Sequence, residues 1–95
     1  MLADALRRLR RDTTWTLAAT VEVAHDVGHP QGMTRWDDCW LVTTVHADRR
    51  VGEVFTVADG GDLVERRELV DGDRFHPGGL CVDADGVWIA LAEYR

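Results

Sequence analysis

Short apolar runs separated by turn residues dominate the chain after residue 12. Between them lie clusters of Asp and Gly, which accept the positive φ that tight hairpins require. Residues 13–24 are rich in Thr, Val and Trp and also predict a strand. We therefore expect residues 13–95 to form an all-β, antiparallel body without helices. The other predicted strands contain residues 32–35, 39–45, 53–58, 63–70, 79–82 and 87–92.

The first twelve residues follow a helical period instead. Leu2, Leu6 and Leu9 are spaced as one stripe of a short helix, and four Arg residues cover the rest of its surface. This pattern predicts a short amphipathic leader helix over residues 1–12. About ten residues are few for stable binding to a membrane surface, so we expect solvent around this helix.

The polarity of the predicted strands differs along the chain. Residues 39–45 and 87–92 are mostly apolar at both sets of alternating positions, which is typical of strands between two layers. The strand over residues 63–70 carries Glu-Arg-Arg-Glu in its middle and should face water. Inner strands buried on both faces and a charged outer strand are what a β-propeller blade requires.

An internal repeat supports the same architecture. The segment HPQGM at residues 29–33 recurs as HPGGL at residues 76–80, and strands led by Trp40 and Trp88 follow the two copies. A period of about 40–50 residues with four short strands is the signature of a propeller. The chain then holds about one and a half blades, so we expect a truncated, N-terminal propeller fragment. The alternative is a small open sheet or tandem hairpin fold that dimerises to cover its edges.

Three segments resemble a bacterial family of uncharacterised propeller-type proteins. They are HPQGM at 29–33, FHPGG at 75–79 and WIALAEYR at 88–95, and the likeness extends over about residues 14–95. The resemblance implies a propeller whose chain continues past the equivalent of Arg95, and it implies no established activity. The blade is more distantly similar to lactonase-like and streptogramin-lyase-like propellers, which is an analogy of fold alone.

Composition narrows the classes of function. All 11 basic residues are Arg, and the formal net charge is −6. This net negative charge argues against a nucleic-acid surface. No apolar run approaches the ~20 residues of a membrane span, and no export signal is visible, so we expect a cytoplasmic protein. The chain has no Ser, P-loop or dinucleotide fingerprint. The expected partners are the remaining blades of the propeller or a self-association partner.

The repeat also places the candidate ligand-binding residues. In a propeller, the entrance to each innermost strand and the end of each second strand open on one face around the central channel. The first group is His29, Gln31 and His76. The second group is His46, Asp48, Arg49, Glu93, Tyr94 and Arg95.

Two classes of function follow from these residues. The leading interpretation is a scaffold that binds a small molecule or a partner, and this fragment should be inactive alone. The alternative is a metal-dependent hydrolase or lyase in which His29, His76 and Glu93 hold a divalent ion such as Zn, Mn or Fe(II). Either His can instead be structural, since His-Pro-x-Gly suits a joint that every blade repeats. Whether the protein is an enzyme stays open at this point.

Two further features have plain structural interpretations. Cys39 and Cys81 lie in apolar runs and favour two buried free thiols over a disulfide. Residues 83–86, Asp-Ala-Asp-Gly, begin like a calcium loop. The Glu that such a loop needs at its twelfth position would fall at Tyr94, so a hairpin turn is favoured.

Overall fold

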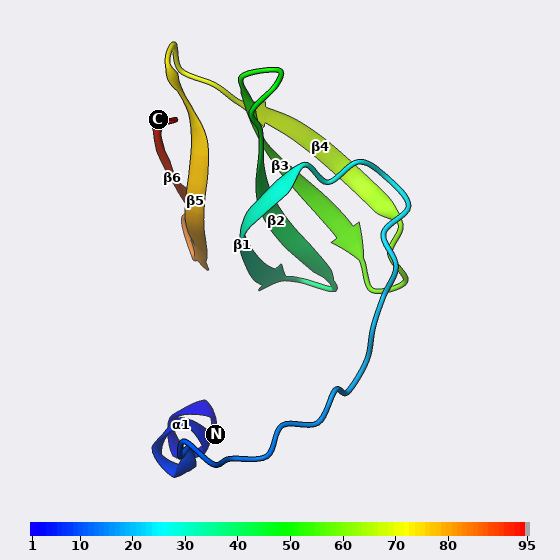
Figure 1. Cartoon of the computed structure of the whole chain (residues 1–95), viewed down its shortest axis with the longest axis vertical. Coiled ribbons are helices and arrows are strands. Elements are labelled where there is room, and N and C mark those ends of the chain that lie inside the picture. The colour runs from blue at the N-terminus through cyan, green and yellow to red at the C-terminus, as the bar shows by residue number, and fades with distance from the viewer. Residues whose placement is uncertain (95) are drawn as a thin grey trace.

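The structure, a computed structural model, describes residues 1–94 (Figure 1). Arg95, one of the predicted ligand residues, lies outside the described residues. One short helix precedes six antiparallel strands, and none of the helices among residues 1–94 is long and apolar enough to cross a membrane. The elements are α1 (Leu2–Arg8), β1 (His29–Trp36), β2 (Cys39–His46), β3 (Val51–Ala58), β4 (Leu63–Leu69), β5 (Arg74–Asp83) and β6 (Gly86–Glu93).

The strands form two separate sheets. Strands β1 to β4 make a four-stranded meander in sequence order, and β5 pairs with β6 in a hairpin. The register of β2 with β3 is unbroken, from Cys39 opposite Ala58 to His46 opposite Val51. Since every connection is a short turn between neighbours, the chain forms the first sheet from local contacts alone.

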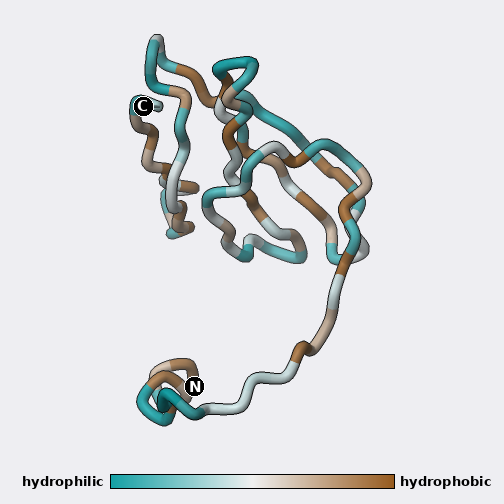
Figure 2. The backbone as a smooth tube through the Cα atoms, in the orientation of Figure 1, coloured by the Kyte–Doolittle hydropathy of each residue, from teal (hydrophilic) through white to brown (hydrophobic). Residues whose placement is uncertain are grey.

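The hairpin packs across one face of the meander, as Figure 1 shows. On β2 the buried side chains of Leu41, Thr43 and Val45 alternate with residues on the opposite face. Thr43 faces the hairpin, because its hydroxyl donates a hydrogen bond of 2.8 Å to the carbonyl of Gly78 on β5. Phe75 of β5 is 1% exposed, and on the opposite face of the meander Phe55 and Val57 of β3 are also buried. Apolar positions therefore occur in both sheets, as the brown stretches of Figure 2 show.

The closest approach of the sheets is at Gly52 of β3. A Cβ atom at this position would lie 2.5 Å from the Phe75 carbonyl oxygen and 2.7 Å from Cδ of Pro77. It would also lie 2.8 Å from the carbonyl oxygen of Leu69 on β4. Only glycine lets backbone from two sheets meet this closely.

The antiparallel β architecture with one N-terminal helix is confirmed. Each apolar run after residue 31 lies in a strand or overlaps one, and α1 lies within the first twelve residues. Strand β4 is exposed along nearly its whole length, as its charged centre predicted. The helix ends earlier than predicted, because Leu9 already has the extended backbone angles φ −66° and ψ 138°.

Two expectations about strands were wrong. Residues 13–24 form no strand, because no strand edge among residues 1–94 pairs with them, and Trp15 and Leu17 remain exposed. Strand β6 is not covered on both faces: Trp88 is 58% exposed. Its side facing the meander, with Val87 and Ile89, lines a cavity of about 390 Å³ between the sheets.

The thiols and the acidic turn can also be compared with the prediction. Cys39 and Cys81 are free, as expected, but Cys81 is exposed rather than buried because it lies on the outer side of the hairpin. Residues 83–86 form a hairpin turn. The Asp83 carboxylate accepts hydrogen bonds from the backbone of Asp85 at 2.8 Å and from the indole of Trp88 at 3.0 Å, which lower the pKa of Asp83.

We expect Gly52→Val to lower the free energy of unfolding by about 3 kcal/mol, since its side chain would force the two sheets apart. Chemical denaturation measures this loss. The control is Gly79→Ala on β5, where a Cβ would meet no atom within 4 Å. That change should stay within about 0.5 kcal/mol. Equal effects of the two substitutions would contradict the close approach at Gly52.

Candidate functional site

The two sheets share one end, which we call the rim: the starts of β1, β3 and β5 and the ends of β2, β4 and β6. His29 at the start of β1 lies opposite Val45 near the end of β2, and Val45 lies opposite Gly52. Gly52 lies against Phe75 at the start of β5. The first residues of β1 and β5 therefore lie at the same end of the molecule.

Arg50 connects the two sheets at the rim. It ends the turn between β2 and β3 with a left-handed backbone, φ 54°. Its guanidinium carbon lies 4.8 Å from the centre of the Phe75 ring, and its Nη2 lies 3.5 Å from Asp73. A cation over an aromatic ring and an exposed ion pair each contribute modestly, up to about 1 kcal/mol. Together they hold the turn over the start of β5.

The rim residues of the second sheet form an aromatic cluster. Tyr94 stacks on Phe75 with ring centroids 5.4 Å apart and meets the ring of His76 edge-on at 5.3 Å. Glu93 is the exposed last residue of β6 and lies opposite Arg74. The structure thus brings His76 and Tyr94, two of the predicted ligand residues, into direct contact.

The predicted residues of the first sheet divide into two environments. His29 and Gln31 lie together on β1, with the Gln31 amide nitrogen 3.1 Å from Nδ1 of His29. His46, the last residue of β2, is instead only 4% exposed. Asp48 and Arg49 lie in the exposed turn that follows it.

The predicted metal ligands do not form a complete site in the part of the chain that the structure describes. No group of three or more His, Cys, Asp or Glu side chains among residues 1–94 is arranged to hold a metal ion. A set built on His29, His76 and Glu93 would need ligands from elsewhere in an assembly, and it stays a prediction.

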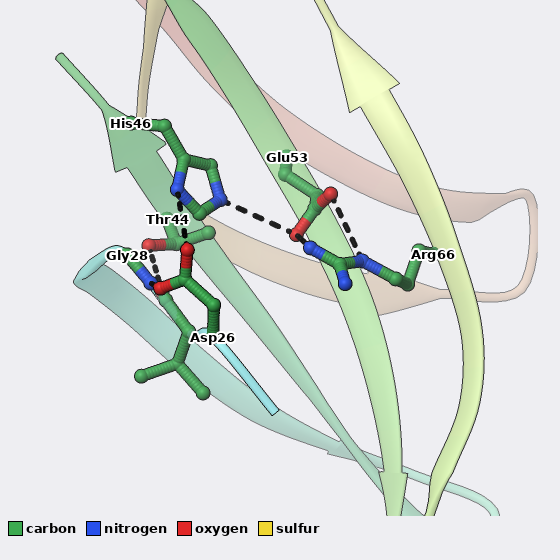
Figure 3. Close-up of polar contacts among 7 residues, drawn as sticks. Asp26, Gly28, Thr44, His46, Glu53 and Arg66 are labelled. Carbon is green, nitrogen blue, oxygen red and sulfur yellow. Dashed lines mark hydrogen bonds and ion pairs between the residues drawn. The ribbon is translucent and has the colours of Figure 1, made fainter. Parts of the chain in front are cut away.

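A buried charged cluster lies on the meander face opposite the hairpin (Figure 3). Its centre is Glu53 of β3, which is 6% exposed although it carries a carboxylate. Arg66 of β4 binds both carboxylate oxygens: Nη2 donates to Oε1 at 2.8 Å and Nε donates to Oε2 at 3.1 Å. These bonds raise the pKa of Arg66 further above its usual range.

His46 lies on the other side of Glu53. Its Nε2 is 3.5 Å from the same Oε1 that accepts from Arg66, and this nitrogen is buried without a hydrogen-bond partner. The contact is therefore electrostatic, without the geometry of a hydrogen bond. Its Nδ1 faces the Asp26 carboxylate at 3.9 Å. The imidazole thus lies between two carboxylates, one on each nitrogen (Figure 3).

The segment before β1 closes this cluster from outside. Asp26 accepts a hydrogen bond of 2.9 Å from the backbone N–H of Gly28, which lowers the pKa of Asp26, and nearby His46 lowers it further. The hydroxyl of Thr44 donates to the Val27 carbonyl. Gly28 has φ +58°, and a Cβ there would come within 2.8 Å of both His46 and Thr44. The segment is therefore seated closely on the imidazole.

Sequence analysis identified His46 as a candidate but missed its partners. Asp26 lies outside every predicted strand, and Glu53 and Arg66 fall in the predicted strands over residues 53–58 and 63–70. One signal was available: Glu53 alternates with Phe55 and Val57 on one face of β3, so a carboxylate stands in an apolar series. Such a buried charge requires a cationic partner.

Comparison with known proteins gives one family. The chain matches a family described as "Family of unknown function (DUF6454)" over residues 1–95. No curated protein and no solved structure shows significant similarity to it.

We expect Arg66→Met to destabilise the fold by about 2 kcal/mol because it leaves the Glu53 carboxylate buried without its partner. Fully buried pairs lose about 3–5 kcal/mol, and the 35% exposure of the Arg66 side chain reduces this. Chemical denaturation at pH 7 measures the loss.

The matched control is Arg67→Met, the neighbouring substitution on β4. Arg67 is 72% exposed and pairs with the exposed Glu65, so its replacement should change stability by less than about 0.5 kcal/mol. Adding Glu53→Gln to Arg66→Met should recover part of the loss, because the stranded charge is removed. If the two Arg substitutions have equal effects, Glu53 is not the buried charge that Arg66 compensates.

Proposed function

We propose that this chain, which belongs to that family of unknown function, is the N-terminal part of a β-propeller that serves as a binding scaffold. In this proposal residues 13–95 contribute about one and a half blades and residues 1–12 a leader helix. The ligand is a small molecule or a partner protein, bound at the rim.

One observation carries the proposal. The second sheet stacks face to face on the first, and β5, which contains HPGGL, begins at the same end of the molecule as β1, which contains HPQGM. Blades of a propeller stack in this way, with innermost strands running in the same direction around a channel. The bond from Thr43 to Gly78 and the contact of Gly52 with Phe75 support the same arrangement.

The chemistry of the rim suits binding. His29 and Gln31 offer neutral donors and acceptors on the first sheet, and His76 with Tyr94 offers an aromatic and polar pair on the second. Arg49 in the turn after β2 adds an exposed cation. A few polar groups beside aromatic rings are what recognition of small molecules requires.

The experiment is a set of titrations of the ¹⁵N-labelled chain, followed by amide chemical shifts. Zinc chloride tests a metal, sodium succinate an anion, and glucose a neutral polyol. We expect shifts confined to the rim, and we expect the double change His29→Ala with His76→Ala to abolish them. The control is Asp85→Ala in the turn between β5 and β6, at the opposite end, which should leave them unchanged.

The outcomes separate the candidate functions. Stoichiometric zinc binding that the double change abolishes would favour the metal-dependent hydrolase or lyase over the scaffold. Shifts from succinate or glucose at the rim favour the scaffold. Shifts centred on the opposite turns, or none with any of the three probes, would contradict a binding site at the rim.

A further inference from the structure

We propose that His46 is a proton-binding site whose occupation fastens residues 22–28 to the meander. The site lies on the face opposite the hairpin, so it does not rest on the proposed function of the rim. Figure 3 shows its members converging from the segment, β2, β3 and β4.

The first step is the position of the imidazole between two acids. Asp26 faces Nδ1 at 3.9 Å and Glu53 faces Nε2 at 3.5 Å. A neutral imidazole carries one N–H and can direct it toward only one of these carboxylates, while its other nitrogen presents a lone pair. The imidazolium carries two N–H groups and attracts both carboxylates at once. A proton on His46 therefore adds an attraction to Asp26 that the neutral ring lacks.

The second step is the difference between the two carboxylates. Glu53 is largely compensated by the two hydrogen bonds from Arg66 and belongs to the sheet itself. Asp26 belongs to the segment, and its side chain is 74% exposed. The added attraction between the imidazolium and Asp26 therefore acts across the contact between segment and sheet.

The third step is that packing and side-chain contacts, without strand pairing, hold the segment; one of them seats the Glu22 backbone against Gly61 in the turn between β3 and β4. The Thr44 hydroxyl bonds to Val27, Gly28 packs on the His46 ring, and the ring of His25 meets Phe55 edge-on at 4.9 Å. Each is local, and residues 22–28 pair with no strand among residues 1–94. A change of charge on His46 therefore acts on a segment that no strand pairing holds in place.

The pH range follows from the two titrating groups. The hydrogen bond from Gly28 lowers the pKa of Asp26, so this carboxylate stays ionised down to below its ordinary value of 3.8. Imidazole ordinarily gains its proton near pH 6.5. The segment is held most firmly between these limits and loosens as the pH rises past neutrality. Arg49, in the turn after β2, also attracts Asp26 but keeps its charge throughout.

His25 lies in the same segment and carries a second imidazole. Its Nε2 is buried without a hydrogen-bond partner, and its ring meets Phe55 edge-on. The substitution His25→Phe keeps an aromatic ring on Phe55 and removes this second imidazole. It supplies the background for the test.

The experiment measures hydrogen-exchange protection factors of the amides in residues 22–28 at pH 5.5 and pH 8.0. In the His25→Phe chain we expect about fivefold greater protection at pH 5.5, the ratio given by about 1 kcal/mol for a partly exposed ion pair. Adding either Asp26→Asn or His46→Gln should bring the ratio close to one. Adding Asp48→Asn, which changes an exposed carboxylate in the turn after β2, should leave the fivefold ratio unchanged.

Protection of the β2 and β3 amides shows in each variant that the sheet is folded. Equal protection of residues 22–28 at both pH values in the His25→Phe chain would overturn the proposal. So would a fivefold ratio that survives Asp26→Asn, a surface change that the sheet tolerates, because the proton would then act elsewhere.

Discussion

The approach of β5 to the meander at Gly52 is the constraint on which the rest of the structure depends. Without a side chain at this position, the Phe75 carbonyl lies within van der Waals reach of β3, and Phe75 itself becomes the most deeply buried large residue. The hairpin has no hydrogen-bonded strand neighbour in the first sheet, so face-to-face packing and a few side-chain contacts, such as the bond from Thr43 to Gly78, position it. The contact between Gly52 and Phe75 sets the direction of β5. It therefore also sets which ends of the two sheets form the rim.

The two faces of the meander are stabilised by different interactions. The face toward the hairpin is closed by apolar packing and by the bond between Thr43 and Gly78. The opposite face buries the Glu53 carboxylate, which is tolerable only because Arg66 binds both of its oxygens. An arginine in the outer strand therefore has a structural role, although its neighbours Glu65 and Arg67 pair with each other in solvent.

Much of this fold could be predicted from the sequence, because its strands are local and separated by Asp-Gly turns. The prediction failed for residues whose position depends on contacts with distant parts of the chain. Residues 13–24 have the propensity of a strand, yet propensity forms no strand without a neighbouring edge. Arg66 and Arg67 are indistinguishable in the sequence, and only the register with β3 shows that Arg66 reaches Glu53. His46 was predicted as a ligand-binding residue. Its burial between two carboxylates depends on residues 22–28, and no sequence pattern predicted that this segment packs on His46.

The two copies of the repeated segment lie in different surroundings. Trp40 and Trp88 are 48 residues apart, and the same spacing makes Tyr94 the counterpart of His46. His46 is the last residue of β2, and Tyr94 directly follows β6. Tyr94 stacks on Phe75 at the rim, whereas His46 turns to the opposite face and meets Asp26 and Glu53. Equivalent positions in the two copies, such as His46 and Tyr94, lie at or just after the end of corresponding strands. The side chains around each position determine its contacts. The charged cluster is thus specific to the first unit, where the segment entering β1 provides the carboxylate that covers the imidazole.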